Sequence, residues 1–398
     1  MGTQRLLTGL IIVAILCNRA APAIGHLAFG LMVILAGWMW WKERKQIKQG
    51  LTASSSVSRL AKMYGGLFLV FLCTTLPSVF VGDLYTGLRT VVYILSYRFI
   101  MFLVTVKFIR KREYLYSLIA AFFITVAADS LLSYYQYYLS GFKYRGLGFA
   151  GPMLALGGIL CIAVPIALVT LFDLSFPRWL RYLSGLSLAP FVMGFLGNQS
   201  RSTWIFSAFS VSVVGLRYCF KSWKIVLPVM VLAFGFAYYI YQDPILMRRL
   251  GSAINTTTDG SNLGRIYVWK SSINMIKDHF FFGVGLEQFA DVYRSAYILP
   301  EEWQRLGNAH NNFLQIFAET GIVGFIGFLI WIFGSIGYGI REFLKRNYSP
   351  YLFSIVLLFL VYHVIFGLVE YTLVINARMI AFWVLLAVML QLEDTKEK

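Results

Sequence analysis

Charged residues are scarce in this chain. Lys, Arg, Asp and Glu together make up 13% of its 398 residues, whereas hydrophobic residues make up 59% and the mean hydropathy is +0.69. Soluble domains carry about 25% charged residues, so this composition excludes an ordinary soluble enzyme. Apolar stretches recur along nearly the whole sequence at close to the roughly 20 residues that a membrane-spanning helix needs. The sequence therefore predicts an integral membrane protein with a single transmembrane domain over residues 1–398.

Cysteines are few, and the common cofactor motifs are missing. The four cysteines all lie in apolar stretches without paired spacing: Cys17, Cys73, Cys161 and Cys219. This pattern gives no sign of a disulfide framework or a cysteine metal site. The sequence also has no P-loop, no Rossmann fingerprint, no metal-ligand cluster and no internal repeat. We therefore expect no cofactor and no bound metal.

The apolar stretches predict an all-α polytopic protein with about twelve transmembrane helices. The first stretch has no clear small-residue cleavage site and is followed at once by a second, so we expect an uncleaved helix rather than a signal peptide. The predicted spans cover residues 6–17, 24–41, 60–80, 89–108, 114–135, 152–172, 182–197, 203–218, 225–241, 313–339, 351–369 and 373–392.

The distribution of positive charge indicates how the chain is oriented. The net charge is +17, and basic residues cluster between apolar stretches, within 42–48, 107–112, 178–181, 217–224 and 341–346. A nucleic-acid interface would place them along one polar face, so we expect membrane lipids and no nucleic acid as partners. The positive-inside rule assigns these clusters and both termini to the cytoplasm. Residues 243–312 then form one large loop that faces a periplasm or an equivalent exterior space.

This outer loop is near neutral in charge and has helical patterns of its own. Residues 264–277 place apolar side chains at the spacing of an amphipathic helix, and a second short helix is expected over 286–297. A third is expected to begin at Pro300, because proline and the following acids favour a first helical turn. Amphipathic helices of this kind can lie on the membrane and roof a cavity.

His310 is the sharpest catalytic candidate. Of the four histidines, two lie in predicted spans and a third lies in the amphipathic part of the loop, whereas His310 sits among Asn308, Asn311 and Asn312 directly before a hydrophobic helix. An imidazole there can take a proton from an acceptor hydroxyl near neutral pH. The alternative is a helix-capping polar cluster in which His310 is only an interfacial side chain. Position alone leaves both interpretations open.

Three arginines are candidates for binding an anion. Arg145, Arg201 and Arg265 lie in three separate outer segments at similar predicted depth in the membrane. Guanidinium groups are planar, always charged and bidentate, as the diphosphate of a lipid carrier requires. For any one of them alone, the alternative is an interfacial arginine that snorkels to lipid phosphates. Their convergence in space is inferred from the predicted topology.

Two segments around His310 resemble the signature of the O-antigen ligase and polymerase superfamily of polytopic bacterial enzymes. They are His310-Asn311-Asn312-Phe313-Leu314 and Glu319-Thr320-Gly321-Ile322-Val323-Gly324. Upstream, Ser200-Arg201 is similar to the Ser-Arg motif of the family. Gly264-Arg265 with Trp269 is similar to the arginine-bearing start of its large loop helix. The stretch from Arg145 to Pro152 is similar, more loosely, to a further arginine region of the family.

The resemblance implies a metal-independent, inverting glycosyltransferase of the membrane-embedded GT-C type, in the bacterial inner membrane. Its donor would be a glycan on undecaprenyl diphosphate, and its acceptor a sugar hydroxyl of lipid A-core on the periplasmic side. His310 would be the base or acceptor-positioning group. Arg201 and Arg265 would hold the diphosphate, with Arg145 as a helper. The supporting residues would be Ser200, Asn311 and Asn312.

Several members of this superfamily fit the same signature. An O-antigen ligase is preferred because the chain is compact and has one dominant outer loop, residues 243–312. The nearest alternative is a polymerase of O-antigen or another surface polysaccharide, and a protein O-oligosaccharyltransferase is a further one. A polysaccharide flippase or transporter belongs to a different class, for which an inverted repeat and midplane charges would be expected.

Overall fold

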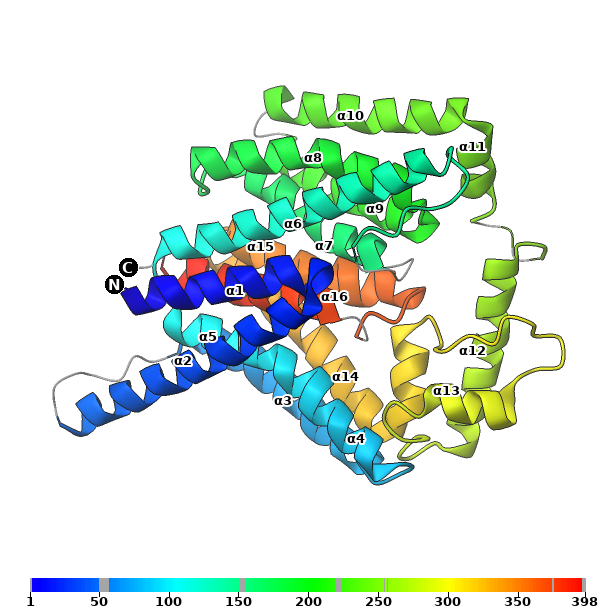
Figure 1. The fold of residues 1–398 in the computed structure, drawn as a ribbon, viewed down its shortest axis with the longest axis horizontal. Coiled ribbons are helices and arrows are strands. Elements are labelled where there is room, and N and C mark those ends of the chain that lie inside the picture. Colours follow the sequence, from blue (N-terminus) through cyan, green and yellow to red (C-terminus); the bar gives the residue numbers. More distant parts are fainter. Residues whose placement is uncertain are drawn as a thin grey trace.

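The computed structural model describes residues 2–49, 57–149, 155–219, 223–253, 255, 257–373 and 376–395. Over these residues the chain forms α-helices with short π and 3-10 stretches, and no strand. Figure 1 shows the start of α1 (Gly2–Ala20) and the end of α16 (Asn376–Asp394) at one end of the bundle, and the long loop at the other. Both ends of the described chain thus lie away from the loop, while their assignment to the cytoplasm stays a prediction.

Each predicted span falls on a helical segment, although residues 152–154 of the sixth and 374–375 of the twelfth lie outside the described residues. Two of the segments change between α and π geometry along their length, namely Leu84–Phe108 and Pro350–Leu368. The first contains α4 (Leu84–Thr90), η1 (Val91–Ser96) and α5 (Tyr97–Phe108), and the second α15 (Pro350–Leu357), η3 (Leu358–Ile365) and η4 (Phe366–Leu368). The others, besides α1 and α16, are α2 (Pro22–Lys48), α3 (Arg59–Val79), α6 (Arg112–Leu139), α7 (Ala155–Phe172), α8 (Arg178–Asn198), α9 (Arg201–Tyr218), α10 (Trp223–Gln242) and α14 (Asn312–Lys345).

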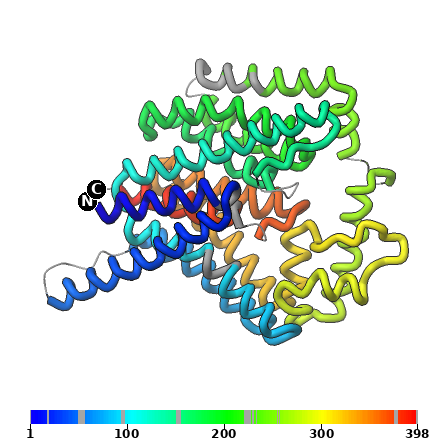
Figure 2. The backbone as a smooth tube through the Cα atoms, viewed as in Figure 1, coloured from blue at the N-terminus to red at the C-terminus, as the bar shows by residue number. Residues whose placement is uncertain are grey.

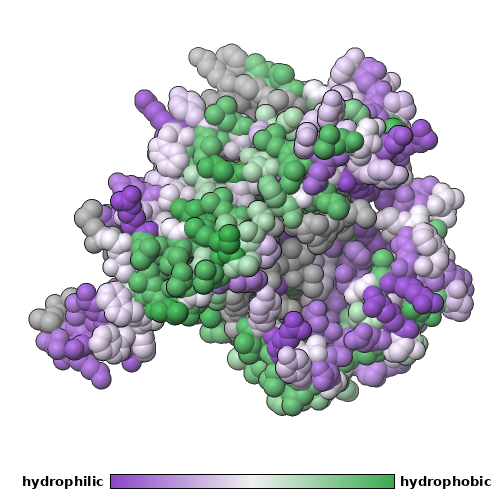
Figure 3. Space-filling view, in the orientation of Figure 1, coloured by the Kyte–Doolittle hydropathy of each residue, from purple (hydrophilic) through white to green (hydrophobic). Residues whose placement is uncertain are grey.

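Among the described residues, 8 helical stretches are long and apolar enough to cross a membrane. The protein is therefore an all-helical, multi-pass membrane protein. The count of about twelve stays a prediction, because α1, α9, α10 and α16 form helices at the expected places but are not among the eight. In the space-filling view, hydrophobic side chains gather over the middle of the bundle, and hydrophilic ones over the long loop and the tip of α2 (Figure 3).

Helix α7 lies inside the bundle because it is apolar on every side. All of its residues except Leu171 are buried, and it packs against α8 and α9. A Cβ atom at Gly157 of α7 would lie 2.4 Å from Oγ1 of Thr203, so glycine is what lets the start of α9 approach α7 so closely. This contact fixes the position of Arg201, the first residue of α9.

The long loop is folded beyond the ends of the spans, on the side away from the N-terminus (Figure 2). It contains α11 (Pro244–Gly251), α12 (Gly260–Asp278), α13 (Phe289–Val292) and η2 (Tyr293–Tyr297). The prediction of a helix over 264–277 is confirmed by α12, and the one over 286–297 is confirmed for its second part. The prediction of a third helix at Pro300 is wrong. The backbone makes a single turn there, with Glu302 N–H donating to Leu299 O at 2.9 Å, and Arg305 is left-handed with φ 48°.

Helix α14 differs from the single span expected over 313–339, because it is broken at Gly321. Gly321 has φ 62° and ψ −168°, and a Cβ atom there would lie 2.3 Å from the backbone of Phe281. The loop after α12 fills the break, since Ile322 N–H donates to Phe280 O at 2.8 Å and Val284 N–H donates to Ala318 O at 2.9 Å. The segment that follows His310 is therefore a short helix anchored to the loop, and a longer helix begins only after the glycine.

Candidate active site

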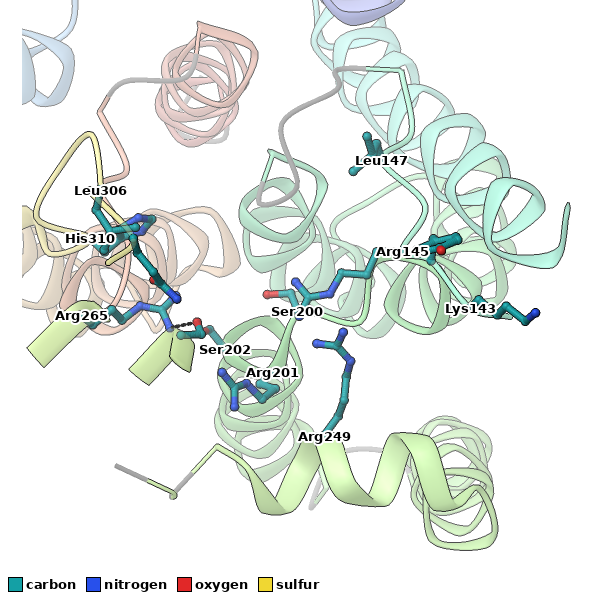
Figure 4. A pocket seen from close by; sticks show the side chains of 13 residues that line it. Lys143, Arg145, Leu147, Ser200, Arg201, Ser202, Arg249, Arg265, Leu306 and His310 are labelled. Atoms are coloured by element: carbon teal, nitrogen blue, oxygen red, sulfur yellow. Dashed lines mark hydrogen bonds between the residues drawn. The ribbon is translucent and has the colours of Figure 1, made fainter. Parts of the chain in front are cut away.

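A cavity of about 620 Å³ lies at the end of the bundle that carries the long loop. The predicted site residues Arg145, Arg201, Arg265, His310 and Ser200 all line it (Figure 4). They come from the α6–α7 connection, the start of α9, α12 and the segment before α14. The structure therefore brings together residues up to 165 positions apart in sequence, from Arg145 to His310. The roles assigned to them remain predictions.

The lining of this cavity is strongly basic. Its basic side chains, called the arginine group below, are Lys143, Arg145, Arg201, Arg249 and Arg265, and none of the described residues that line the cavity is acidic. Burial lowers the pKa of Arg145 to about 10, and the nearby charges of Arg249, Arg201 and Arg265 act in the same direction. Like charges crowded in a partly dry site repel one another. A bound anion would relieve that repulsion, so the cavity suits an anionic group.

Arg201 is held in place by the start of the loop helix α12. Its guanidinium donates to both carboxylate oxygens of Asp259, at 3.0 and 3.1 Å, and to Oγ of Ser252 at 2.6 Å. Asp259 also caps α12 by accepting from Asn262 N–H at 3.0 Å. Burial would raise the pKa of Asp259, but the hydrogen bonds from Arg201 and Asn262 outweigh it and lower the pKa. The carboxylate thus ties α9 to α12 while the other face of Arg201 lines the cavity.

Arg265 lies further along α12, four residues after Ser261. Its Nη1 donates to Oγ of Ser261 at 3.2 Å, whereas its buried Nε has no hydrogen-bond partner among the described residues. Burial lowers its pKa, with the carboxylate of Glu370 opposing this effect and the charge of Arg201 adding to it. An unpartnered buried donor costs free energy, so Arg265 is ready to bind an anionic oxygen.

His310 is fixed mainly through the backbone of residues 308–312, called the histidine segment below. The backbone of His310 is left-handed, with φ 45°, and its N–H donates to Oδ1 of Asn308 at 2.9 Å. The N–H of Ala309 donates to Oε1 of Gln315 at 2.7 Å, and the carbonyl of Ala309 accepts from Nε1 of Trp269 at 2.9 Å. A non-glycine residue holds such a conformation only where its surroundings enforce it, which is common at active sites.

Asn311 and Asn312 do not line the cavity. Asn311 caps α14 by accepting from Phe313 N–H at 2.8 Å and Leu314 N–H at 3.1 Å, and its Nδ2 donates to Leu368 O at 2.9 Å. Asn312 is fully buried and bonds with Thr372. The helix-capping interpretation is therefore correct for Asn311, while the neighbouring His310 turns into the cavity.

Part of the chain is similar to a known protein family. Residues 186–329 match the family model described as O-antigen ligase. Over this part of its length the chain is similar to the O-antigen ligase family. The matched range includes Arg201, Arg265 and His310, and it confirms the resemblance seen in the sequence. A comparison with curated proteins found no match.

The sequence analysis did not single out some of the residues at this cavity. Arg249 on α11 and Lys143 in the α6–α7 connection both line the cavity. The Arg248-Arg249 pair in the loop could have indicated an anion-binding residue. The sequence does not show which of the two faces the cavity, whereas the structure places Arg249 in its lining and leaves Arg248 exposed. Glu370 also reaches the site, since its Oε2 lies 3.4 Å from Nδ1 of His310.

Proposed function

We propose that the protein is an O-antigen ligase that transfers a glycan from undecaprenyl diphosphate to a sugar hydroxyl of lipid A-core, in lipopolysaccharide biosynthesis. The observation that carries this proposal is a cavity whose lining, in the described part of the chain, has five basic side chains, one histidine and no acidic residue. The similarity of residues 186–329 to the O-antigen ligase family supports ligase or polymerase activity. The choice of ligase rests on the compact chain and its single long loop.

The arginine group would bind the diphosphate of the donor. Arg201 and Arg265 hold its oxygens, and Arg145 and Arg249 add positive charge. The N-terminal end of α9, where Ser200 and Ser202 line the cavity, favours negative charge in the same place. Negative charge grows on the diphosphate as its bond to the sugar breaks. Fixed cations at this point stabilise the transition state and can replace a metal ion in that role.

His310 would act as the base. The acceptor hydroxyl attacks the anomeric carbon, the new carbon–oxygen bond forms as the bond to the diphosphate breaks, and the hydroxyl proton passes to Nε2 of His310. Because the acceptor enters opposite the leaving diphosphate, this single displacement inverts the anomeric configuration. The released lipid diphosphate keeps the electron pair of the broken bond.

The remaining features follow from the same assignment. We place the cavity on the periplasmic side of the inner membrane, and both termini in the cytoplasm, because the basic tip of α2 lies at the end of the bundle opposite the loop (Figure 1). The GT-C assignment rests on the family resemblance. A polymerase would use the same donor but extend another carrier-linked glycan.

The lipopolysaccharide of a deletion strain tests the proposal. A ligase predicts that long glycan accumulates on the carrier lipid and is absent from lipid A-core, and that wild-type protein restores the ladder whereas His310→Ala does not. Lipid A-core with a single repeat would indicate a polymerase instead. A flippase is tested with purified protein in detergent, where transfer of glycan to lipid A-core without a membrane barrier would exclude it.

A further inference from the structure

Glu370 lies in the turn between η4 and α16 and faces His310 from outside the cavity lining. Its Oε2 is 3.4 Å from Nδ1 of His310. The Glu370 side chain is 8% exposed and that of His310 is 18% exposed, so this is a largely buried pair rather than a surface ion pair. The other ring nitrogen, Nε2, is the one left for the cavity.

The histidine segment and the turn that carries Glu370 are joined on both sides of this contact. Nδ2 of Asn311 donates to Leu368 O at 2.9 Å. Asn312 accepts from Thr372 N–H at 2.8 Å and donates to Oγ1 of Thr372 at 2.9 Å. Leu368 and Thr372, which flank Glu370, are thus hydrogen-bonded to Asn311 and Asn312, the two residues that follow His310. This pairing fixes the carboxylate against the imidazole in a way that side-chain contact alone would not.

The surroundings of Glu370 favour its charged form. Burial would raise the pKa of its carboxyl, but the hydrogen bond with His310, the charge of His310 and the guanidinium groups of Arg378 and Arg265 outweigh it and lower the pKa. The group next to Nδ1 is therefore a carboxylate, which accepts hydrogen bonds and donates none.

We propose that Glu370 is a positioning residue that accepts a hydrogen bond from Nδ1–H of His310 and so holds the imidazole in the tautomer with a free Nε2 lone pair. This inference rests on the proposed function, in which His310 is the base. When the acceptor hydroxyl gives its proton to Nε2, the Nδ1 proton stays in place and Glu370 stays ionised. Its negative charge then stabilises the imidazolium, as carboxylates do in comparable acid–base sites.

The tautomer of His310 can be measured without any substrate. Protein labelled with ¹³C and ¹⁵N at histidine and reconstituted in lipid gives tautomer-specific NMR shifts. Spectra of His310→Gln identify the signals of His310 among the four histidines. We expect the Nδ1–H tautomer in the wild type and in Glu370→Asp, and a mixture of tautomers in Glu370→Gln. A wild-type His310 in the Nε2–H form, or the same pure tautomer in Glu370→Gln, would overturn the proposal.

Activity provides the second measurement. We expect Glu370→Gln to lower kcat by about 10-fold to 100-fold with little change in KM, as loss of an orienting partner typically does, and Glu370→Asp to recover part of it. The matched control is Glu302→Gln, which changes a buried acid of the long loop that does not line the cavity and should leave kcat unchanged. If Glu370→Gln fails to fold, the tautomer of His310 in the wild type and the kcat of Glu370→Asp still test the proposal.

The two proposals fail in different ways. Wild-type kcat in Glu370→Gln with a changed tautomer would overturn the positioning role alone. Wild-type kcat in His310→Ala would overturn the proposed base and leave the tautomer result standing as a structural fact.

Discussion

The arginine group and the histidine segment meet in one cavity but are built in opposite ways. The arginine group is assembled from four parts of the chain, the α6–α7 connection, α9, α11 and α12. The histidine segment is five consecutive residues fixed by hydrogen bonds that Trp269 and Thr372 donate to it and one that Gln315 accepts from it. Stabilising a spread negative charge needs several cations at approximate distances, whereas proton transfer needs one atom at hydrogen-bonding distance. We therefore expect graded losses from arginine changes and an almost complete loss from the histidine.

The largest expected effect is that of His310→Ala. Purified protein in lipid nanodiscs, supplied with carrier-linked glycan and lipid A-core, should lose about 10²-fold to 10⁴-fold in kcat, the usual contribution of a positioned base. Donor binding should change little because the arginine group is intact. His279→Ala is the control, since His279 ends α12 and does not line the cavity. Equal kcat in these two variants would remove the contrast between the two parts of the site.

Arg201→Ala comes next, with an expected loss of about 10²-fold to 10³-fold in kcat for one transition-state donor. Arg201→Lys should recover only part of the lost kcat, because lysine lacks the bidentate fork of the guanidinium group. Asp259→Asn separates this role from the ion pair, since it breaks the pair while keeping the guanidinium. A loss as large in Asp259→Asn as in Arg201→Ala would mean that Arg201 only joins α9 to α12.

Arg249→Ala should have a smaller effect. Removing one of several charged donors is expected to raise KM for the donor by about 10-fold to 100-fold, the range for a hydrogen bond to a charged group. Arg248→Ala is the matched control on the same helix, because Arg248 is exposed and does not line the cavity. If steady-state kinetics give the same KM for both variants, Arg249 does not belong to the donor site.

Asn312→Ala should act on stability more than on chemistry. It leaves the buried N–H of Thr372 without its acceptor, which costs about 1–3 kcal/mol. Thermal unfolding of the purified protein should show a lower midpoint than the exposed control Asn274→Ala on α12. An unchanged midpoint would mean that the histidine segment is not held by this contact.

The smallest expected effect is that of a chelator, which should leave the rate of transfer unchanged because the arginine group supplies the positive charge. The assay is repeated after treatment with EDTA and again after adding back magnesium. Loss of activity that magnesium restores would show that the arginines do not act without a metal.

The sequence alone determined the helical membrane character, because hydrophobicity adds up locally along each span. It also identified His310, Arg201 and Arg265, since polar and charged side chains at the ends of apolar spans are exceptional and matched a known signature. It placed α12 for a similar reason, as helical periodicity is a property of neighbouring residues.

Only the tertiary structure decided how these residues meet. Arg249 faces the cavity because α11 is oriented by its packing, and Glu370 reaches His310 because Asn311 and Asn312 bind the turn that carries it. The sequence predicted one continuous span over 313–339, but the structure breaks it at Gly321, where the backbone of Phe281 packs against the glycine. These contacts join residues tens of positions apart, and no local pattern of side chains encodes them.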